Sequence, residues 1–96
     1  MSGFSFDIPE DFSEYEWEVE AKGWFSGARL TVSGKHYHLN FYDPTRLNQE
    51  IQSEFNCGNV FFEPNLVIVQ SATRANMERA ATLLVESNRV TSLVET

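Results

Sequence analysis

Hydrophobic and polar residues alternate strictly over residues 14–21. The apolar positions are Tyr15, Trp17, Val19 and Ala21, and the positions between them are Glu14, Glu16, Glu18 and Glu20. A period of two is typical of a β-strand with one buried face. The pattern therefore predicts a first strand that begins near Tyr15 and carries a ladder of glutamates on its outer face.

Two Ser-Gly pairs predict tight turns farther along the chain, at Ser26-Gly27 and at Ser33-Gly34. Residues 28–33 and 35–42 again alternate, which predicts a second and a third strand. With Ser33-Gly34 as the turn, Leu30 faces Tyr37 and Ala28 faces Leu39. Apolar residues then meet apolar residues across the hairpin, as a one-sided sheet requires.

Two helices are predicted in the second half of the chain. Asp43 and Pro44 are suited to the start of a helix over residues 44–55, which has apolar residues at every fourth position. Ser71 or Thr73 can cap a second helix that ends near Asn88. Between the helices, residues 60–63 and 66–70 read as two strands, the second one central because it is continuously apolar. Residues 89–96 are predicted as a tail or a short strand.

Taken together, these elements predict a two-layer α+β domain. Its mainly antiparallel five-stranded sheet follows the order β-β-β-α-β-β-α, with both helices on one face. Residues 1–12 are predicted as an N-terminal acidic arm with Phe4, Phe6 and Ile8 as anchors, residues 13–90 as the single domain and residues 91–96 as a C-terminal tail. The second face of such a sheet is left to solvent or to a partner.

The charge of the chain is concentrated at its start. The 96 residues have a net charge of −7, and residues 1–20 contain seven acids and no base, while the remainder is balanced. A concentrated negative field repels phosphate backbones, so we expect no nucleic-acid binding. The same field attracts a basic protein and speeds its association. A basic protein partner is therefore the expectation, and the alternative is an acidic segment that only aids solubility.

The predicted strands also place side chains on the open face of the sheet. Trp24, Arg29 and His38 would form one row, with Tyr42 farther along the third strand. Trp, Tyr and Arg dominate the energetics of interfaces. The predicted partner-binding residues are therefore Glu16, Glu18, Glu20, Trp24, Arg29 and Tyr42. Alternatively, Trp24 is covered within the chain, by the N-terminal arm or by Arg29 in a cation–π contact.

His36 and His38 project from the same side of the third strand and are candidate metal ligands. A third ligand is missing from the local sequence, so we expect neither a metal nor another cofactor. The chain contains no known catalytic motif. The alternative function is a homodimer that binds or converts a small ligand on the open sheet face around His36 and His38.

The favoured interpretation is a small acidic, non-enzymatic interaction module of the inhibitor, immunity or chaperone type. The predicted order of strands and helices is similar to that of dimeric secretion chaperones, which add an N-terminal helix. A single cysteine, Cys57, indicates a reducing compartment such as the cytoplasm. No apolar run approaches the ~20 residues of a membrane span, so no membrane association is expected.

Overall fold

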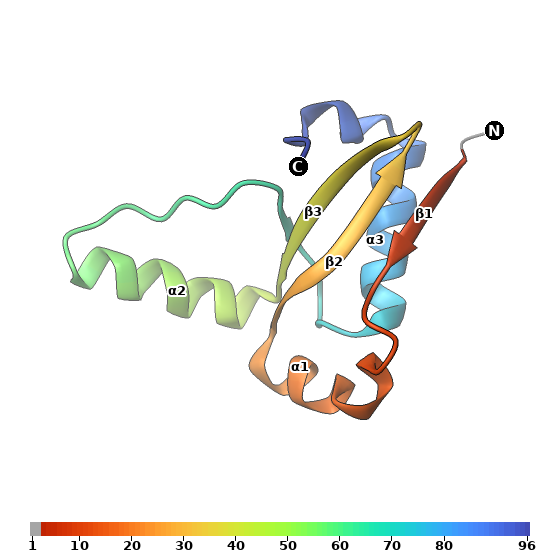
Figure 1. The fold of residues 1–96 in the computed structure, drawn as a ribbon. Helices are drawn as coiled ribbons and strands as arrows, with labels where there is room; N and C mark the ends of the chain where they lie inside the picture. Colours follow the sequence, from red (N-terminus) through yellow and green to blue (C-terminus); the bar gives the residue numbers. More distant parts are fainter. Residues whose placement is uncertain (1–2) are drawn as a thin grey trace.

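The computed structural model describes residues 3–96 and has an α+β fold, as predicted, with a four-stranded sheet and three α-helices (Figure 1). The strand order is β1-β2-β3-β4; β4 is parallel to β3, and the other neighbours are antiparallel. The prediction of five strands is wrong by one. The elements in chain order are β1 (Phe4–Asp7), η1 (Phe12–Glu14), α1 (Glu16–Lys22), β2 (Trp24–Val32), β3 (Lys35–Tyr42), α2 (Pro44–Asn56), β4 (Leu66–Ile68), α3 (Arg74–Glu86) and η2 (Arg89–Ser92).

The alternating segment is a helix, which corrects the predicted first strand. Phe12, Tyr15 and Val19 recur at helical spacing, and they turn inward together at the end of the sheet. Glu is a good helix former and a poor strand former, so three glutamates within seven residues favour α1. Gly23 ends the helix in the left-handed conformation, with its N–H bonded to the carbonyl of Val19.

Part of the segment expected as an arm forms the first strand of the sheet instead. Residues 4–7 make up β1, which pairs with β2 from Phe4↔Val32 to Asp7↔Arg29. The ring of Phe6 packs edge-on against Phe41 at 6.1 Å between centroids. Met1 and Ser2 of the predicted arm lie outside the described residues. The anchoring role expected of Phe4 and Phe6 is thus fulfilled through strand pairing.

The hairpin of β2 and β3 is confirmed in its predicted register. Leu30 pairs with Tyr37 and Ala28 with Leu39. The turn residues Ser33 and Gly34 both have positive φ, as a tight hairpin turn requires. The turn expected at residues 26–27 is wrong: β2 continues through them with a bulge between Phe25 and Ala28.

Helix α2 begins at Pro44, and the Asp43 side chain caps it by accepting a hydrogen bond from the Arg46 N–H at 2.7 Å. It buries no residue and projects away from the sheet, and residues 57–65 return beside it (Figure 1). The expectation that both helices cover one face is therefore wrong for α2. Because the chain leaves β3 and comes back through this excursion, the next strand is parallel to β3.

The two strands expected after α2 are only partly formed. Residues 60–63 make no strand, and β4 is a three-residue edge strand rather than a central one. The reason is local: the Asn40 side-chain amide donates to the Pro64 carbonyl at 2.9 Å, and Phe61 packs edge-on against Tyr42. These contacts hold residues 61–64 against β3 without pairing residues 60–63 to any strand of the sheet.

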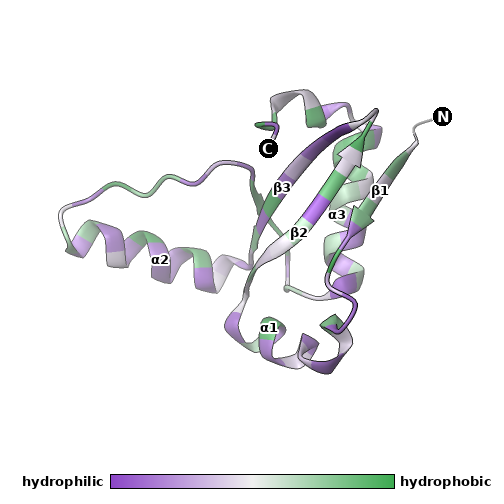
Figure 2. Ribbon diagram, viewed as in Figure 1, coloured by the Kyte–Doolittle hydropathy of each residue, from purple (hydrophilic) through white to green (hydrophobic). Residues whose placement is uncertain are grey.

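Helix α3 covers the inner face of the sheet and is capped by Thr73, one of the two residues predicted for this role. Figure 2 shows hydrophobic residues along α3 and also along the segment that returns from α2. The core lies between the sheet and α3, and its largest fully buried side chains are Phe12, Phe41, Leu30, Leu39 and Met77.

The C-terminal residues form η2 and a short extended end, rather than a strand of the sheet. Asn65, in the left-handed conformation, donates to the carbonyls of His38 and Val94 and accepts from the Val94 N–H. The Thr96 N–H donates to the His36 carbonyl at 2.8 Å. The end of the chain therefore lies beside the start of β3, next to β4 along the same edge.

Candidate functional site

The acidic residues of the N-terminal segment lie on β1, η1, α1 and the loop between β1 and η1. We define the acidic surface as the six of them that are exposed: Asp7, Glu10, Asp11, Glu14, Glu18 and Glu20. The helix places Glu18 on a different side from Glu16 and Glu20, so the straight ladder expected from a strand does not form. The result is an acidic region spread over a turn of chain and a short helix.

Trp17 is the residue that the sequence interpretation placed wrongly. In α1 the inward positions are Tyr15 and Val19, so Trp17 points outward and is 70% exposed. It lies next to Glu18 on a helix without another large exposed apolar side chain. The helical spacing of Phe12, Tyr15 and Val19 was the signal that could have placed it. An outward Trp beside acids is a surface on which a cationic, partly apolar partner can pack.

Glu16 has a structural contact that separates it from Glu18 and Glu20. Its carboxylate accepts a hydrogen bond from the Arg74 N–H at 2.8 Å, in the first turn of α3. A carboxylate at this position also interacts favourably with the positive end of the helix dipole. The guanidinium of Arg74 lies over the Phe12 ring, 5.7 Å from its centroid. Glu16 thus joins α1 to α3 and is half-buried.

The structure does not bring Trp24, Arg29 and Tyr42 together as one surface. Trp24 pairs with Tyr42 across β2 and β3, but Tyr42 is only 4% exposed. The cation over the Trp24 ring is Arg46, at 5.9 Å from the centroid, and not Arg29, which the sequence offered as one alternative. Arg29 is exposed on the open part of the sheet, opposite His38.

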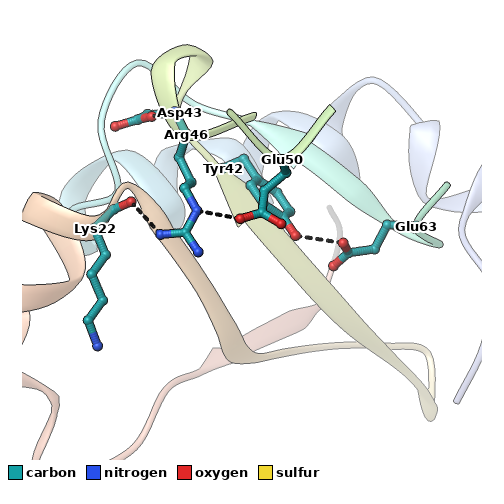
Figure 3. Close-up of polar contacts among 6 residues, drawn as sticks. All are labelled: Lys22, Tyr42, Asp43, Arg46, Glu50 and Glu63. Carbon is teal, nitrogen blue, oxygen red and sulfur yellow. Dashed lines mark hydrogen bonds and ion pairs between the residues drawn. The ribbon is translucent and has the colours of Figure 1, made fainter. Parts of the chain in front are cut away.

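A polar cluster fixes the base of α2 where the helix leaves the sheet (Figure 3). Arg46 donates to the Glu50 carboxylate at 2.8 Å and to the Lys22 carbonyl at 3.4 Å. The Tyr42 hydroxyl donates to the Glu63 carboxylate at 2.6 Å. Burial, and next the hydrogen bond to Glu63, raise the pKa of Tyr42 well above its usual range. This cluster positions the excursion of α2 and residues 57–65.

Each of the two histidines has a partner within the chain. The Nδ1 atom of His36 lies 3.0 Å from the Thr31 hydroxyl oxygen, and the Nε2 atom of His38 is hydrogen-bonded to the Ser26 carbonyl. In residues 3–96, no group of three or more His, Cys, Asp or Glu side chains is placed to hold a metal ion. Two grooves in the described part of the chain lie along β4 and α3, and neither is lined by these histidines.

None of the helices in residues 3–96 has the length and apolar character needed to cross a membrane. Comparison of the chain with family models, curated proteins and solved structures finds no match. The site must therefore be interpreted from its own chemistry.

Proposed function

We propose that this chain is a small protein-interaction module that binds a basic protein through the acidic surface and Trp17. The observation that carries the proposal is the 70% exposure of Trp17 on a helix within the segment that holds all of the net charge. Exposed acids steer a basic partner to the surface, and a desolvated Trp supplies the affinity.

The other residues predicted to bind a partner do not all belong to the proposed binding surface. Arg29 lies on the open sheet face beside Asp7, its register partner on β1, and it belongs to the edge of the binding surface. Trp24 and Tyr42 contact residues of their own chain at the base of α2 and do not take part. Glu16 stabilises the fold by capping α3. Binding then depends on Trp17, Glu18 and Glu20.

The test begins with capture of a basic protein from a cell lysate on the immobilised chain, followed by calorimetry with the purified partner. Two variants probe the surface, Trp17→Ala and the double exchange Glu18→Lys with Glu20→Lys. We expect each to weaken binding by at least about tenfold, the loss typical of an interface hot spot. Both glutamates are exposed, and a lysine at position 20, in the last turn of α1, suits the helix dipole. The fold should therefore persist.

A matched control separates a specific surface from net charge. The control is the double exchange Glu86→Lys with Glu95→Lys. Both residues are exposed; Glu86 is the last residue of α3, and Glu95 lies in the C-terminal segment. Each double variant adds four charge units and changes the net charge from −7 to −3. We expect the control to bind within about twofold of the wild type, since rim charges contribute little to affinity. Equal weakening by both double variants, or full binding by Trp17→Ala, would overturn the proposal.

A further inference from the structure

The outer edge of β4 is unpaired. Alternate residues of β4 and its flanks bond to β3. The first bond runs from the Asn40 N–H to the Asn65 carbonyl, and the last from the Val69 N–H to the Tyr42 carbonyl. In a parallel pair, the residues between these point their N–H and C=O groups the other way. The backbone groups of Leu66 and Ile68 therefore face outward, and no backbone hydrogen bond reaches that side within residues 3–96.

A groove runs along this edge. Its larger part, of about 680 Å³, lies between β4, the C-terminal half of α3 and the last residues of the chain, with Leu84 and Leu93 among its lining. A smaller part, of about 240 Å³, shares Ile68 and continues along α3 past Ala80 and Leu83. Helix α3 thus has an apolar flank beyond the last strand. A strand added beside β4 would cover this flank and satisfy the free backbone groups.

The same chain also contains a strand-like segment that lacks a partner. Residues 60–63 read Val-Phe-Phe-Glu, which has high β-propensity, and their backbone makes no hydrogen bond within the described part of the chain. Val60 is 79% and Phe62 is 83% exposed. Contacts with Asn40 and Tyr42 hold the segment and Pro64 beside β3, where Phe62 and Glu63 line the groove but pair with no strand. The backbone groups of the segment are therefore available to another molecule.

Charge and area both favour a second copy as the occupant. The groove carries both signs of charge, because Arg79, Arg89 and Glu63 of the same chain line it, and the two arginines form no ion pair within residues 3–96. A two-fold interface places the same surface on both copies, so Glu63 of one copy can face the arginines of the other. Five apolar side chains of the segment and the groove are exposed, each with an accessible area on the order of 100 Å². Together they supply more than half of the ~800 Å² that each partner buries in a standard interface. These are Val60, Phe62, Ile68, Leu83 and Val94.

We propose that the protein forms a two-fold symmetric dimer in which residues 60–63 of each copy add as a strand to the free β4 edge of the other. The exchange is reciprocal, so both free edges and both unpaired segments are satisfied at once. Only Pro64 and Asn65 separate the donated segment from the accepting strand, which places the two-fold axis near these residues. This interface uses a different surface from the acidic one and does not depend on the proposed function.

The test is sedimentation equilibrium of the full chain between about 1 and 100 µM, a range that covers typical dimer affinities. Phe62→Lys alters the donated segment, and its fold should persist because the side chain is 83% exposed. Ile68→Pro removes an outward N–H of the accepting edge without removing a bond to β3. We expect a dimeric wild type, and a dissociation constant raised at least about tenfold in each variant.

Trp17→Lys is the matched control, because it also replaces a largely exposed aromatic by lysine, but on α1. It should dimerise like the wild type. If the wild type is still a monomer at the top of this range, about 100 µM, the proposal is overturned. A dimer that both variants leave intact would also overturn it. A monomer that takes up an added extended peptide on the β4 edge would assign this edge to a different partner, and would also overturn it.

Discussion

Tyr42 is the residue at which the sheet and the excursion of α2 and residues 57–65 are joined. It ends β3, donates a hydrogen bond to Glu63 and packs edge-on against Phe61. The sequence placed it on the outer side of the third strand, which is correct, and offered it to a partner. What the sequence lacked was the return of residues 61–64 over it, a contact between positions about twenty residues apart.

The raised pKa of Tyr42 predicts how stability depends on pH. The folded form holds its proton above the ordinary tyrosine pKa of about 10, so the stabilisation is fully present below pH ~10 and is lost as the pH rises toward the folded pKa. Tyr42→Phe removes the hydrogen bond to the Glu63 carboxylate and should lower the unfolding free energy by about 1–2 kcal/mol at pH 7.

Urea unfolding of both proteins at about pH 7, 9 and 10.5 checks this expectation. These values lie on both sides of the ordinary tyrosine pKa of about 10. The gap between wild type and Tyr42→Phe should be constant from pH 7 to 9 and should narrow at the highest pH. Tyr15 and Tyr37 are present in both proteins and affect both alike. A gap that widens above pH 10, the ordinary tyrosine value, would contradict the assigned hydrogen bond.

Gly23 is required by two features at the junction of α1 and β2. Its φ is +74°, in the left-handed region, and a Cβ placed on it would overlap the Asp43 carboxyl group. That carboxyl group caps α2, and the Asp43 N–H donates to the Gly23 carbonyl at 2.8 Å. A side chain at position 23 would therefore disturb both helices that meet here.

Gly34 provides the matched comparison, since its φ is +78° and a Cβ there would meet only open space. Gly34→Ala should lower the unfolding free energy by about 1 kcal/mol, the cost of a left-handed alanine. Gly23→Ala should cost at least about 1 kcal/mol more, because the overlap adds to the same backbone term. Chemical denaturation measures both. Equal losses for the two variants would mean that Asp43 moves aside freely.

At the scale of elements, the hairpin and two of the helices were predictable because their signals are local. Asp43-Pro44, Thr73 and Ser33-Gly34 act through their immediate neighbours, and the structure places each as expected. The first helix was missed because a period of two and a helical period coexist in residues 12–21. The alternation predicted that Trp17 is buried. In the structure Phe12, Tyr15 and Val19 pack against the core instead, and their helical spacing decides the fold.

The strands around Pro64 show where local reasoning stops. Both predicted segments have the composition of strands, but only three residues of the second one pair with β3. Whether a short apolar run becomes a strand depends on an available edge, and residues 60–63 pair with no strand within the described part of the chain. The error in strand number and the proposed exchange between copies therefore have one physical origin.

The candidate site was predictable in charge but not in shape. The concentration of acids in residues 1–20 is a property of the sequence alone, and it carries over directly to the acidic surface. The helical geometry then changes the roles of neighbouring residues, so that Glu16 caps α3 while Trp17 is exposed. Neither role follows from a strand.

For the whole molecule, the two proposed surfaces are separate: the acidic surface lies on the N-terminal elements, and the proposed dimer seam lies at the β4 edge of the sheet. A dimer joined at β4 would leave both acidic surfaces free. Each dimer would then bind two basic partners, or two sites of one partner with the gain in avidity that linkage provides.

Coupling between folding and association gives the last prediction. If the native state is a dimer, its stability must rise with protein concentration by mass action. A hundredfold increase in concentration should raise the wild-type melting temperature by several degrees, given ~4–8 °C per kcal/mol for a domain of this size. Phe62→Lys alters only the proposed dimer interface and weakens association, so its melting temperature should be lower than that of the wild type at the same concentration. Glu18→Lys with Glu20→Lys should retain the wild-type dependence on concentration. Differential scanning calorimetry of the three proteins at matched concentrations distinguishes these cases. A wild-type melting temperature independent of concentration would contradict the dimer, because association of the folded state alone must raise the melting temperature as the concentration rises.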